Sequence, residues 1–182
     1  MRVKFRWYLL VFGLPVSILL VGGVIFVAAG GKLTASNMPP VYVLPLVFVY
    51  ATVVGGGQEE IGWRGVAQPL VEGRYGVFGG GAVVGIFWVL WHFPLLASST
   101  LPFESTNPVV FGFQTVGISV LLAWFYDQTE RSVILAMLFH GWRNATEAFY
   151  PPETLARSIV VVVIWILVVV VVNAERRRTG RT

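Results

Sequence analysis

The stretch Gly55-Gly56-Gly57-Gln58-Glu59-Glu60-Ile61-Gly62-Trp63-Arg64-Gly65 places two adjacent carboxylates and an arginine inside a sequence that is otherwise strongly apolar. An ionisable side chain at bilayer depth costs at least ~2.5–3.5 kcal/mol, so such residues usually pair with one another or perform a function. In a helix, Glu60 and Arg64 stand at i and i+4, where a carboxylate N-terminal to a cation pairs well. Glu59 is rotated about 100° away around the helix. We therefore expect Glu60 to neutralise Arg64 and Glu59 to stay available for chemistry.

The composition around this stretch is that of a membrane protein. Of the 182 residues, 56% are hydrophobic and 12% are charged, whereas about 25% of the residues in a soluble domain are charged. The absence of cysteine excludes disulfides, thiolate metal ligands and a cysteine nucleophile. The net charge of +4 comes from basic residues at the chain ends and between apolar runs. We expect these residues to determine topology and expect no nucleic-acid partner.

Six apolar runs are each close to the ~20 residues that a membrane-spanning helix needs. They cover residues 7–29, 41–57 and beyond, 77–97, 109–126, 132–149 and 158–173, with breaks at 30–32 and 39–40, 69–75, 102 and 108, 127–131 and 151–152. The first run exceeds the usual ~7–15 residues of a signal-peptide core, so we favour a retained span over cleavage near Ala29. The sequence predicts an all-α, polytopic helical bundle of about six transmembrane helices, forming a single membrane domain over residues 1–182.

The basic residues predict the orientation of the chain, because cytoplasmic loops carry an excess of lysine and arginine. With the N-terminus inside, the inner side collects Arg2, Lys4, Arg6, Arg74, Arg131, Arg176, Arg177, Arg178 and Arg181, and the outer side has only Lys32 and Arg157. We predict that both termini are cytoplasmic, which requires an even number of spans. An untargeted, cysteine-free basic chain indicates a multi-pass protein of a prokaryotic plasma membrane.

Both histidines of the chain fall inside apolar runs. His92 lies in Phe87-Trp88-Val89-Leu90-Trp91-His92-Phe93-Pro94, and His140 lies in Phe139-His140-Gly141-Trp142-Arg143-Asn144. A single intramembrane histidine can simply hydrogen-bond a neighbouring helix. That both histidines share this setting favours a functional role.

A polar stripe follows one face of the fifth run. His140, Arg143, Asn144 and Glu147 fall within an arc of about 100° on a helix. Such a stripe faces a cavity or the bundle interior and not lipid. We expect Arg143 and Glu147, at i and i+4, to neutralise each other. His140 and Asn144 then remain as an uncharged pair that donates hydrogen bonds into the cavity.

A carboxylate, two imidazoles and an amide suit the hydrolysis of an amide bond, by either of two mechanisms. In the first, Glu59 takes a proton from water that His92 helps to hold, and His140 with Asn144 stabilises the oxyanion. In the second, Glu59, His92 and His140 bind Zn²⁺ and leave a fourth position open. The chain has no HExxH helix, so no local ligand spacing supports the zinc alternative. The sequence leaves both mechanisms open, with Zn²⁺ as the only candidate cofactor.

Three motifs, in order, resemble those of the CPBP group of intramembrane proteases, also called the ABI family. The group includes CAAX prenyl endopeptidases, proteins similar to lysostaphin resistance protein A, and bacteriocin-processing relatives. Glu59 to Arg64 is similar to its EExxxR motif, Leu90-Trp91-His92-Phe93-Pro94 to its second motif, and His140 with Asn144 to its HxxxN motif. The second motif is usually FxxxH, and this chain departs from it with Trp88 four residues before His92.

The resemblance implies a helical intramembrane endopeptidase whose core covers about residues 41–150. It implies a reaction centre of Glu59, His92, His140 and Asn144, with Glu60 and Arg64 in support. The group is often labelled metalloprotease, while its eukaryotic members resemble glutamate-dependent enzymes in which the second histidine and the asparagine form the oxyanion site. The resemblance also implies the partners of the chain within the lipid bilayer, which would be prenylated CAAX proteins, leader peptides or other membrane-associated peptides.

Two other classes of protein remain as alternatives. A small polytopic transporter would carry polar residues across both leaflets, whereas the fourth and sixth runs are strongly apolar. A non-catalytic immunity or scaffold protein would have no need for all four of Glu59, His92, His140 and Asn144. We therefore favour the endopeptidase, for which the sequence specifies neither the substrate nor the oligomeric state.

Overall fold

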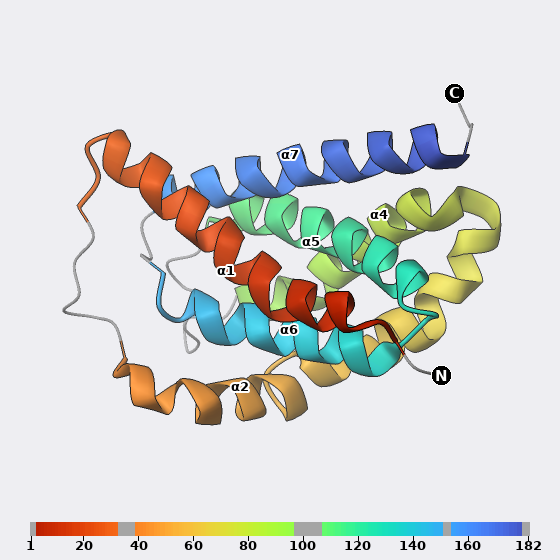
Figure 1. Cartoon of the computed structure of the whole chain (residues 1–182), viewed down its shortest axis with the longest axis horizontal. Helices are drawn as coiled ribbons and strands as arrows, with labels where there is room; N and C mark the ends of the chain where they lie inside the picture. The colour runs from red at the N-terminus through yellow and green to blue at the C-terminus, as the bar shows by residue number, and fades with distance from the viewer. Residues whose placement is uncertain (1–2, 33–38, 97–106, 151–153, 180–182) are drawn as a thin grey trace.

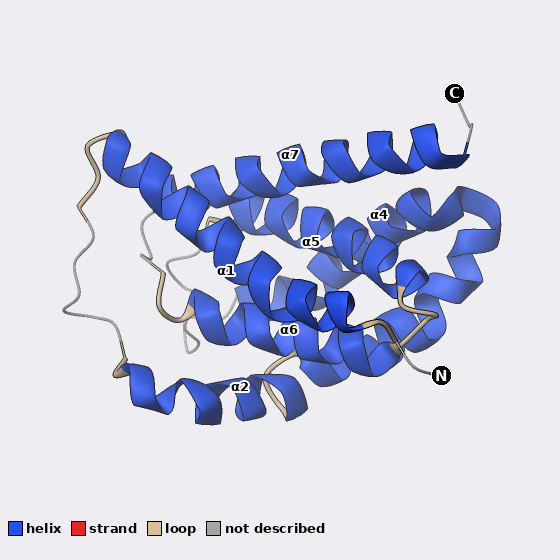
Figure 2. Cartoon of the chain, in the orientation of Figure 1, coloured by secondary structure: helices blue, strands red, loops and turns tan. Residues whose placement is uncertain are grey.

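The computed structural model describes residues 3–32, 39–96, 107–150 and 154–179. Every regular element in these ranges is helical, as Figure 2 shows, which confirms the predicted all-α class. The elements are α1 (Phe5–Ala28), η2 (Val41–Val43), α2 (Leu44–Val53), η3 (Gly57–Glu59), α3 (Glu60–Gly62), η4 (Trp63–Ala67), α4 (Gln68–Leu96), α5 (Pro108–Gln128), α6 (Val133–Glu147) and α7 (Thr154–Thr179).

The long helices form one bundle. The α4 helix packs against α5, α2 against α6, and α1 against both α6 and α7, while α5 also contacts α7 (Figure 1). The N-terminal end of α1 and the C-terminal end of α7 lie at the same end of the bundle. This is the arrangement that two termini on one side of a membrane require.

Four segments within the described residues are long and apolar enough to cross a membrane, so the predicted count of about six is not confirmed. They are Phe5–Ala28, Val41–Leu95, Pro108–Gln128 and Leu155–Arg178. The second segment combines two predicted runs and reverses direction within α4 at Gly76, whose φ is 68° (Figure 1). The α6 helix is not among the four, because its 15 residues span only about 22 Å of a ~30 Å hydrocarbon layer and include the polar stripe.

The predicted breaks differ from the observed ones at two places. Residues 69–75 are helical and belong to α4, which continues from the π-helical turn η4 without a break. The run that starts at Val41 is not one continuous helix, because α2 ends at Val53 and Gly56 takes a φ of 126° that favours glycine. The breaks predicted at Pro102 and at Pro151-Pro152 lie outside the described residues.

Small residues bring α4 and α5 into close contact. A Cβ atom added at Gly81 would lie 2.7 Å from the Cβ of Ala123 and 3.2 Å from the carbonyl oxygen of Ser119. Gly85 meets Ser119 in the same way, at 2.9 Å from its Cβ. Small residues allow the backbones of membrane helices to approach closely, and this contact places Ser119 beside the charged stretch that follows α2.

Candidate active site

The predicted ion pair of Glu60 and Arg64 is confirmed and lies at the centre of the bundle. Both side chains are fully buried, and Arg64 Nη1 lies 3.1 Å from Glu60 Oε2. Arg64 Nη2 also donates to the carbonyl oxygen of Ser119 at 2.6 Å and to its Oγ at 2.8 Å. The Ser119 hydroxyl donates in turn to the carbonyl of Gly81 at 2.7 Å. Arg64 therefore connects its own segment to α5 and, through Ser119, to α4. It lies in the π-helical turn η4, and π-helical turns are frequent at functional sites.

The second oxygen of Glu60 contacts a histidine 80 residues away. Glu60 Oε1 lies 2.8 Å from Nδ1 of His140, which is 3% exposed. Because a carboxylate only accepts hydrogen bonds, Nδ1 carries the proton and Nε2 of His140 points the other way. The carboxylate that neutralises Arg64 thus also fixes the orientation of the imidazole.

Glu59 lies beside two tryptophans. Its Oε2 accepts a hydrogen bond from the indole N–H of Trp88 at 2.8 Å and from that of Trp63 at 3.3 Å. The side chain of Glu59 is only partly buried, unlike that of Glu60. The two adjacent glutamates therefore have different surroundings, as the sequence predicts.

His92 lies on α4, one turn after Trp88. Its Nδ1 is 2.9 Å from the carbonyl oxygen of Trp88, and a carbonyl only accepts, so Nδ1 donates and carries the proton. The His92 ring centroid lies 5.4 Å from that of Phe111 and 6.2 Å from that of Trp88. The backbone of Trp88 thus orients His92 in the way that Glu60 orients His140.

The amide of Asn144 is oriented by two partners. Its Oδ1 accepts from Arg143 Nη1 at 2.9 Å, and its Nδ2 donates to the carbonyl of Gly55 at 3.0 Å. A Cβ atom added at Gly56 would lie 2.8 Å from Asn144 Nδ2 and 2.9 Å from His140 Nε2. The two nitrogens therefore face one point beside Gly56, on the same side of α6, as the predicted stripe requires.

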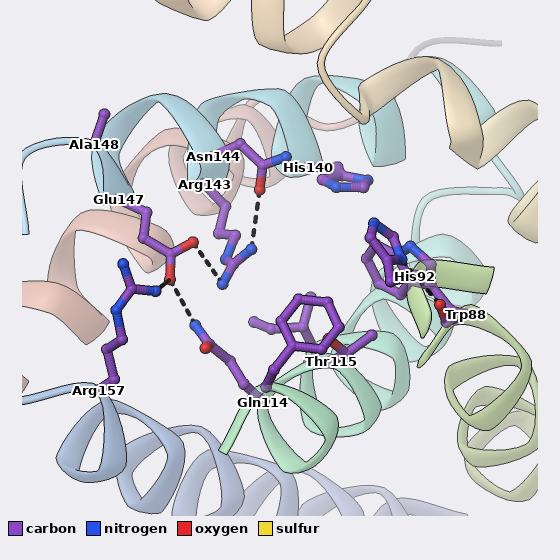
Figure 3. A pocket seen from close by; sticks show the side chains of 12 residues that line it. Trp88, His92, Gln114, Thr115, His140, Arg143, Asn144, Glu147, Ala148 and Arg157 are labelled. Atoms are coloured by element: carbon purple, nitrogen blue, oxygen red, sulfur yellow. Dashed lines mark hydrogen bonds and ion pairs between the residues drawn. The ribbon is translucent and has the colours of Figure 1, made fainter. Parts of the chain in front are cut away.

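A cavity of about 290 Å³ opens beside these residues (Figure 3). His92, His140 and Asn144 line it, whereas Glu59 is joined to it through Trp88, which lines the cavity and donates to Glu59. The two histidines lie at one end of the cavity in Figure 3. Three of the four predicted reaction-centre residues therefore line the cavity, and the fourth, Glu59, contacts the lining residue Trp88.

Charged side chains form the other end of the cavity (Figure 3). Arg143 Nη2 lies 2.7 Å from Glu147 Oε2, which confirms the predicted pair. Glu147 Oε1 accepts from Gln114 Nε2 at 2.8 Å and lies 3.6 Å from Arg157 Nη1. Arg143 and Glu147 thus line the cavity and hold its wall together, with Gln114 and Arg157 as partners that the sequence analysis did not identify.

The predicted zinc ligands do not lie together as a metal-binding group. Within the described ranges, no three His, Cys, Asp or Glu side chains are close enough to hold one ion. Nδ1 of His140 is bonded to Glu60, and Nδ1 of His92 to the Trp88 carbonyl, contacts that a metal-ligating imidazole also makes through its second nitrogen. Because they do not lie together, Glu59, His92 and His140 do not form a three-ligand site in this arrangement, and we derive no catalytic step through a metal.

Besides Gln114 and Arg157, sequence reasoning missed the roles of Trp88 and Ser119. Ser119 belongs to an apolar run and gives no signal of its own. Trp88 gives one signal, since it stands where the second motif of the resembling proteases usually has phenylalanine. The indole N–H that phenylalanine lacks is the group that contacts Glu59.

The chain is similar to known proteins over the region that carries this site. Residues 40–146 match the model of the type II CAAX prenyl endopeptidase Rce1-like family. Over 128 residues the chain is 31% identical to CAAX prenyl protease 2 of Methanococcus maripaludis, covering 67% of this chain and 45% of that protein. The chain thus spans less than half the length of this curated relative. All six predicted site residues fall within the matched region, which covers more than half of the chain, and the protein belongs to the Rce1-like family of type II CAAX prenyl endopeptidases.

Proposed function

We propose that this multi-pass membrane protein is an intramembrane endopeptidase that hydrolyses a peptide bond with a water molecule activated by Glu59. The observation that carries the proposal is the gathering of Glu59, His92 and His140 around one buried side chain, Trp88, next to a polar cavity. Charged and polar groups at this depth are costly unless they serve a function. Family membership supports the same class of reaction.

In the proposed reaction, Glu59 is the general base. It removes a proton from water as the water oxygen attacks the scissile carbonyl carbon, and His92 helps to hold this water. The proton then passes from Glu59 to the leaving amine when the carbon–nitrogen bond breaks. A base of this kind needs an oxygen that is free to meet water, and Glu59 is the less buried of the two glutamates.

The negative oxygen of the tetrahedral intermediate is stabilised by His140 and Asn144. Their Nε2 and Nδ2 atoms face the same point beside Gly56, which supports a shared oxyanion site. Because Nδ1 already donates to Glu60, Nε2 can donate only when His140 is an imidazolium. Glu60 therefore supports the proposed oxyanion site by orienting His140, in addition to its ion pair with Arg64.

The substrate is a peptide that reaches the site from the membrane. Prenylated CAAX-type C-termini are the first candidates, because the relative in Methanococcus maripaludis is a CAAX prenyl protease 2. Leader peptides and membrane anchors are the alternatives from the sequence. We place the protein in a prokaryotic plasma membrane, with the N-terminus and the C-terminus in the cytoplasm.

The test is cleavage by the purified full chain. Prenylated CAAX peptides, leader peptides and transmembrane peptides are incubated with wild type, Glu59→Gln, His92→Ala and the distant control Glu175→Gln. We expect wild type and the control to cleave the same peptide, and the two site variants to lose at least about 100-fold in rate. Equal cleavage by all four proteins would contradict the proposal.

The zinc alternative has its own measurement. Mass spectrometry of the purified protein, with and without prior chelation, gives the metal content, and the same samples are assayed for cleavage. The metal-free mechanism predicts that chelation leaves the rate unchanged. Stoichiometric zinc, with activity lost on chelation and restored by Zn²⁺, would support the metal mechanism instead.

A further inference from the structure

Trp88 contacts three of the four residues on which the proposed mechanism depends. Its indole N–H donates to Glu59 Oε2 at 2.8 Å, and its ring meets the ring of His140 edge-on at a centroid distance of 4.9 Å. Its carbonyl oxygen accepts from His92 Nδ1 at 2.9 Å. Trp88 is 4% exposed, so water does not compete for the indole N–H. A buried indole N–H needs an acceptor, and here the acceptor is the proposed base.

The two oxygens of Glu59 differ because of this contact. The N–H groups of Trp88 and Trp63 both point to Oε2. Among the described residues, no donor is hydrogen-bonded to Oε1. The carboxylate is therefore held by one oxygen, and the other oxygen is available to accept a proton.

The Trp88 contact is the stronger of the two. Its N···O distance of 2.8 Å lies within the usual range for an N–H···O hydrogen bond, whereas the 3.3 Å of Trp63 lies just beyond it. Trp63 is also a near neighbour of Glu59, at i+4, while Trp88 comes from another helix, α4. Only Trp88 therefore fixes Glu59 relative to the helix that carries His92.

We propose that Trp88 is a positioning residue, whose indole N–H holds Oε2 of Glu59 so that Oε1 faces the attacking water. This inference rests on the proposed role of Glu59 as base. A terminal carboxylate otherwise rotates freely about its last bond, and a base that is locked by its neighbours is more effective than one that samples several orientations. Phenylalanine, the usual residue at this point of the motif, fills similar space but has no N–H to donate.

The experiment removes the N–H while keeping the ring. In the full-length protein, Trp88 is replaced by phenylalanine and, separately, by 3-benzothienylalanine, in which sulfur takes the place of the N–H in a ring of nearly the same shape. The matched control is Trp124→Phe, because the N–H of Trp124 also donates to a carboxylate, Glu175 Oε1 at 3.2 Å, away from the site. For each protein, kcat and KM are measured on the peptide that wild type cleaves best, together with the thermal midpoint of unfolding.

Both Trp88 variants are expected to lose about 10- to 100-fold in kcat, the effect of one hydrogen bond to a charged group. The KM values of both variants should stay at the wild-type level. The thermal midpoint of the benzothienylalanine protein should also be that of wild type. The control Trp124→Phe should keep the wild-type kcat. A benzothienylalanine protein with wild-type kcat would overturn the positioning role, even if the phenylalanine variant were unstable, because the ring alone would then be sufficient. An equal fall in kcat for Trp124→Phe would overturn it too. A wild-type protein that cleaved no peptide would overturn the proposed function, and the positioning role with it.

Discussion

His140 Nδ1 lies 2.8 Å from Glu60 Oε1, although 80 residues separate the two in the sequence. The other oxygen of the same carboxylate lies 3.1 Å from Arg64 Nη1. One fully buried carboxylate thus joins a structural ion pair to a histidine of the proposed oxyanion site. Under the proposed mechanism we therefore expect removal of its charge to lower stability and catalysis together, and removal of the Glu59 charge to lower catalysis alone.

The two adjacent glutamates provide the first prediction, through the matched variants Glu59→Gln and Glu60→Gln. Glu60→Gln leaves the buried Arg64 cation without a counter-charge, which should cost about 3–5 kcal/mol of stability. Glu59→Gln should unfold near the wild-type midpoint, because an amide oxygen still accepts from the two indoles, yet it should lose cleavage. Thermal unfolding in detergent and the cleavage assay measure the two effects. Equal stability of the two variants would contradict the assigned division of roles.

Arg64 and Ser119 provide the second prediction. Lysine in place of Arg64 has a single ammonium and cannot reach Glu60 and both oxygens of Ser119 together. Arg64→Lys should therefore unfold at lower temperature than Ser119→Ala, which keeps the backbone carbonyl as an acceptor for the guanidinium. The measurement is again the thermal midpoint in detergent. A Ser119→Ala protein that is less stable than Arg64→Lys would show that the serine hydroxyl, and not the arginine fork, holds α5 in place.

The sequence predicts the local parts of this site because their signals are local. The pairs Glu60–Arg64 and Arg143–Glu147 follow from i,i+4 spacing alone, and both are found. The contacts of Glu60 with His140 and of Arg64 with Ser119 depend on how three helices pack, and no periodicity in one segment encodes them. Trp88 was recognised only as a departure from a motif, since its role depends on a partner 29 residues away.

Prediction of the fold from the sequence was limited in the same way, because local patterns do not encode how the chain turns. Apolar runs predict helices and segments that could span a membrane, and the described residues contain helices and four such segments. The count of spans was less predictable, because hydropathy does not distinguish a membrane-spanning helix from one interrupted by backbone geometry. Gly56 and Gly76 take positive φ values that break or reverse the chain inside apolar sequence, and the sequence does not show which of its many glycines adopt such a conformation.

Gly56 and Gly62 provide the third prediction, as a matched pair of alanine substitutions in one stretch. Alanine at Gly56 would place a methyl group 2.8 Å from Asn144 Nδ2 and 2.9 Å from His140 Nε2, at a φ of 126° that L-residues rarely adopt. An added Cβ at Gly62 meets nothing within 4 Å. Gly56→Ala should lose cleavage, and Gly62→Ala should keep it in the same assay. Wild-type rates for Gly56→Ala would mean that no reacting oxygen occupies the space beside that glycine.

Asn144→Asp provides the last prediction, because it changes one atom of the proposed oxyanion site. The Nδ2 of Asn144 donates to the Gly55 carbonyl, and Oδ1 accepts from Arg143, so the amide has a defined direction. Aspartate of the same shape would place a carboxylate oxygen where a donor stands, opposite the Gly55 carbonyl and the developing oxyanion. We expect kcat to fall about 100- to 1,000-fold with little change in KM, the loss found when an oxyanion donor is removed. The control is Thr146→Val on the same helix, because the Thr146 hydroxyl bonds only backbone carbonyls of α6. If Asn144→Asp kept the wild-type kcat, the oxyanion would have to be stabilised elsewhere, and the convergence of Nδ2 and Nε2 beside Gly56 would be a packing feature of α6.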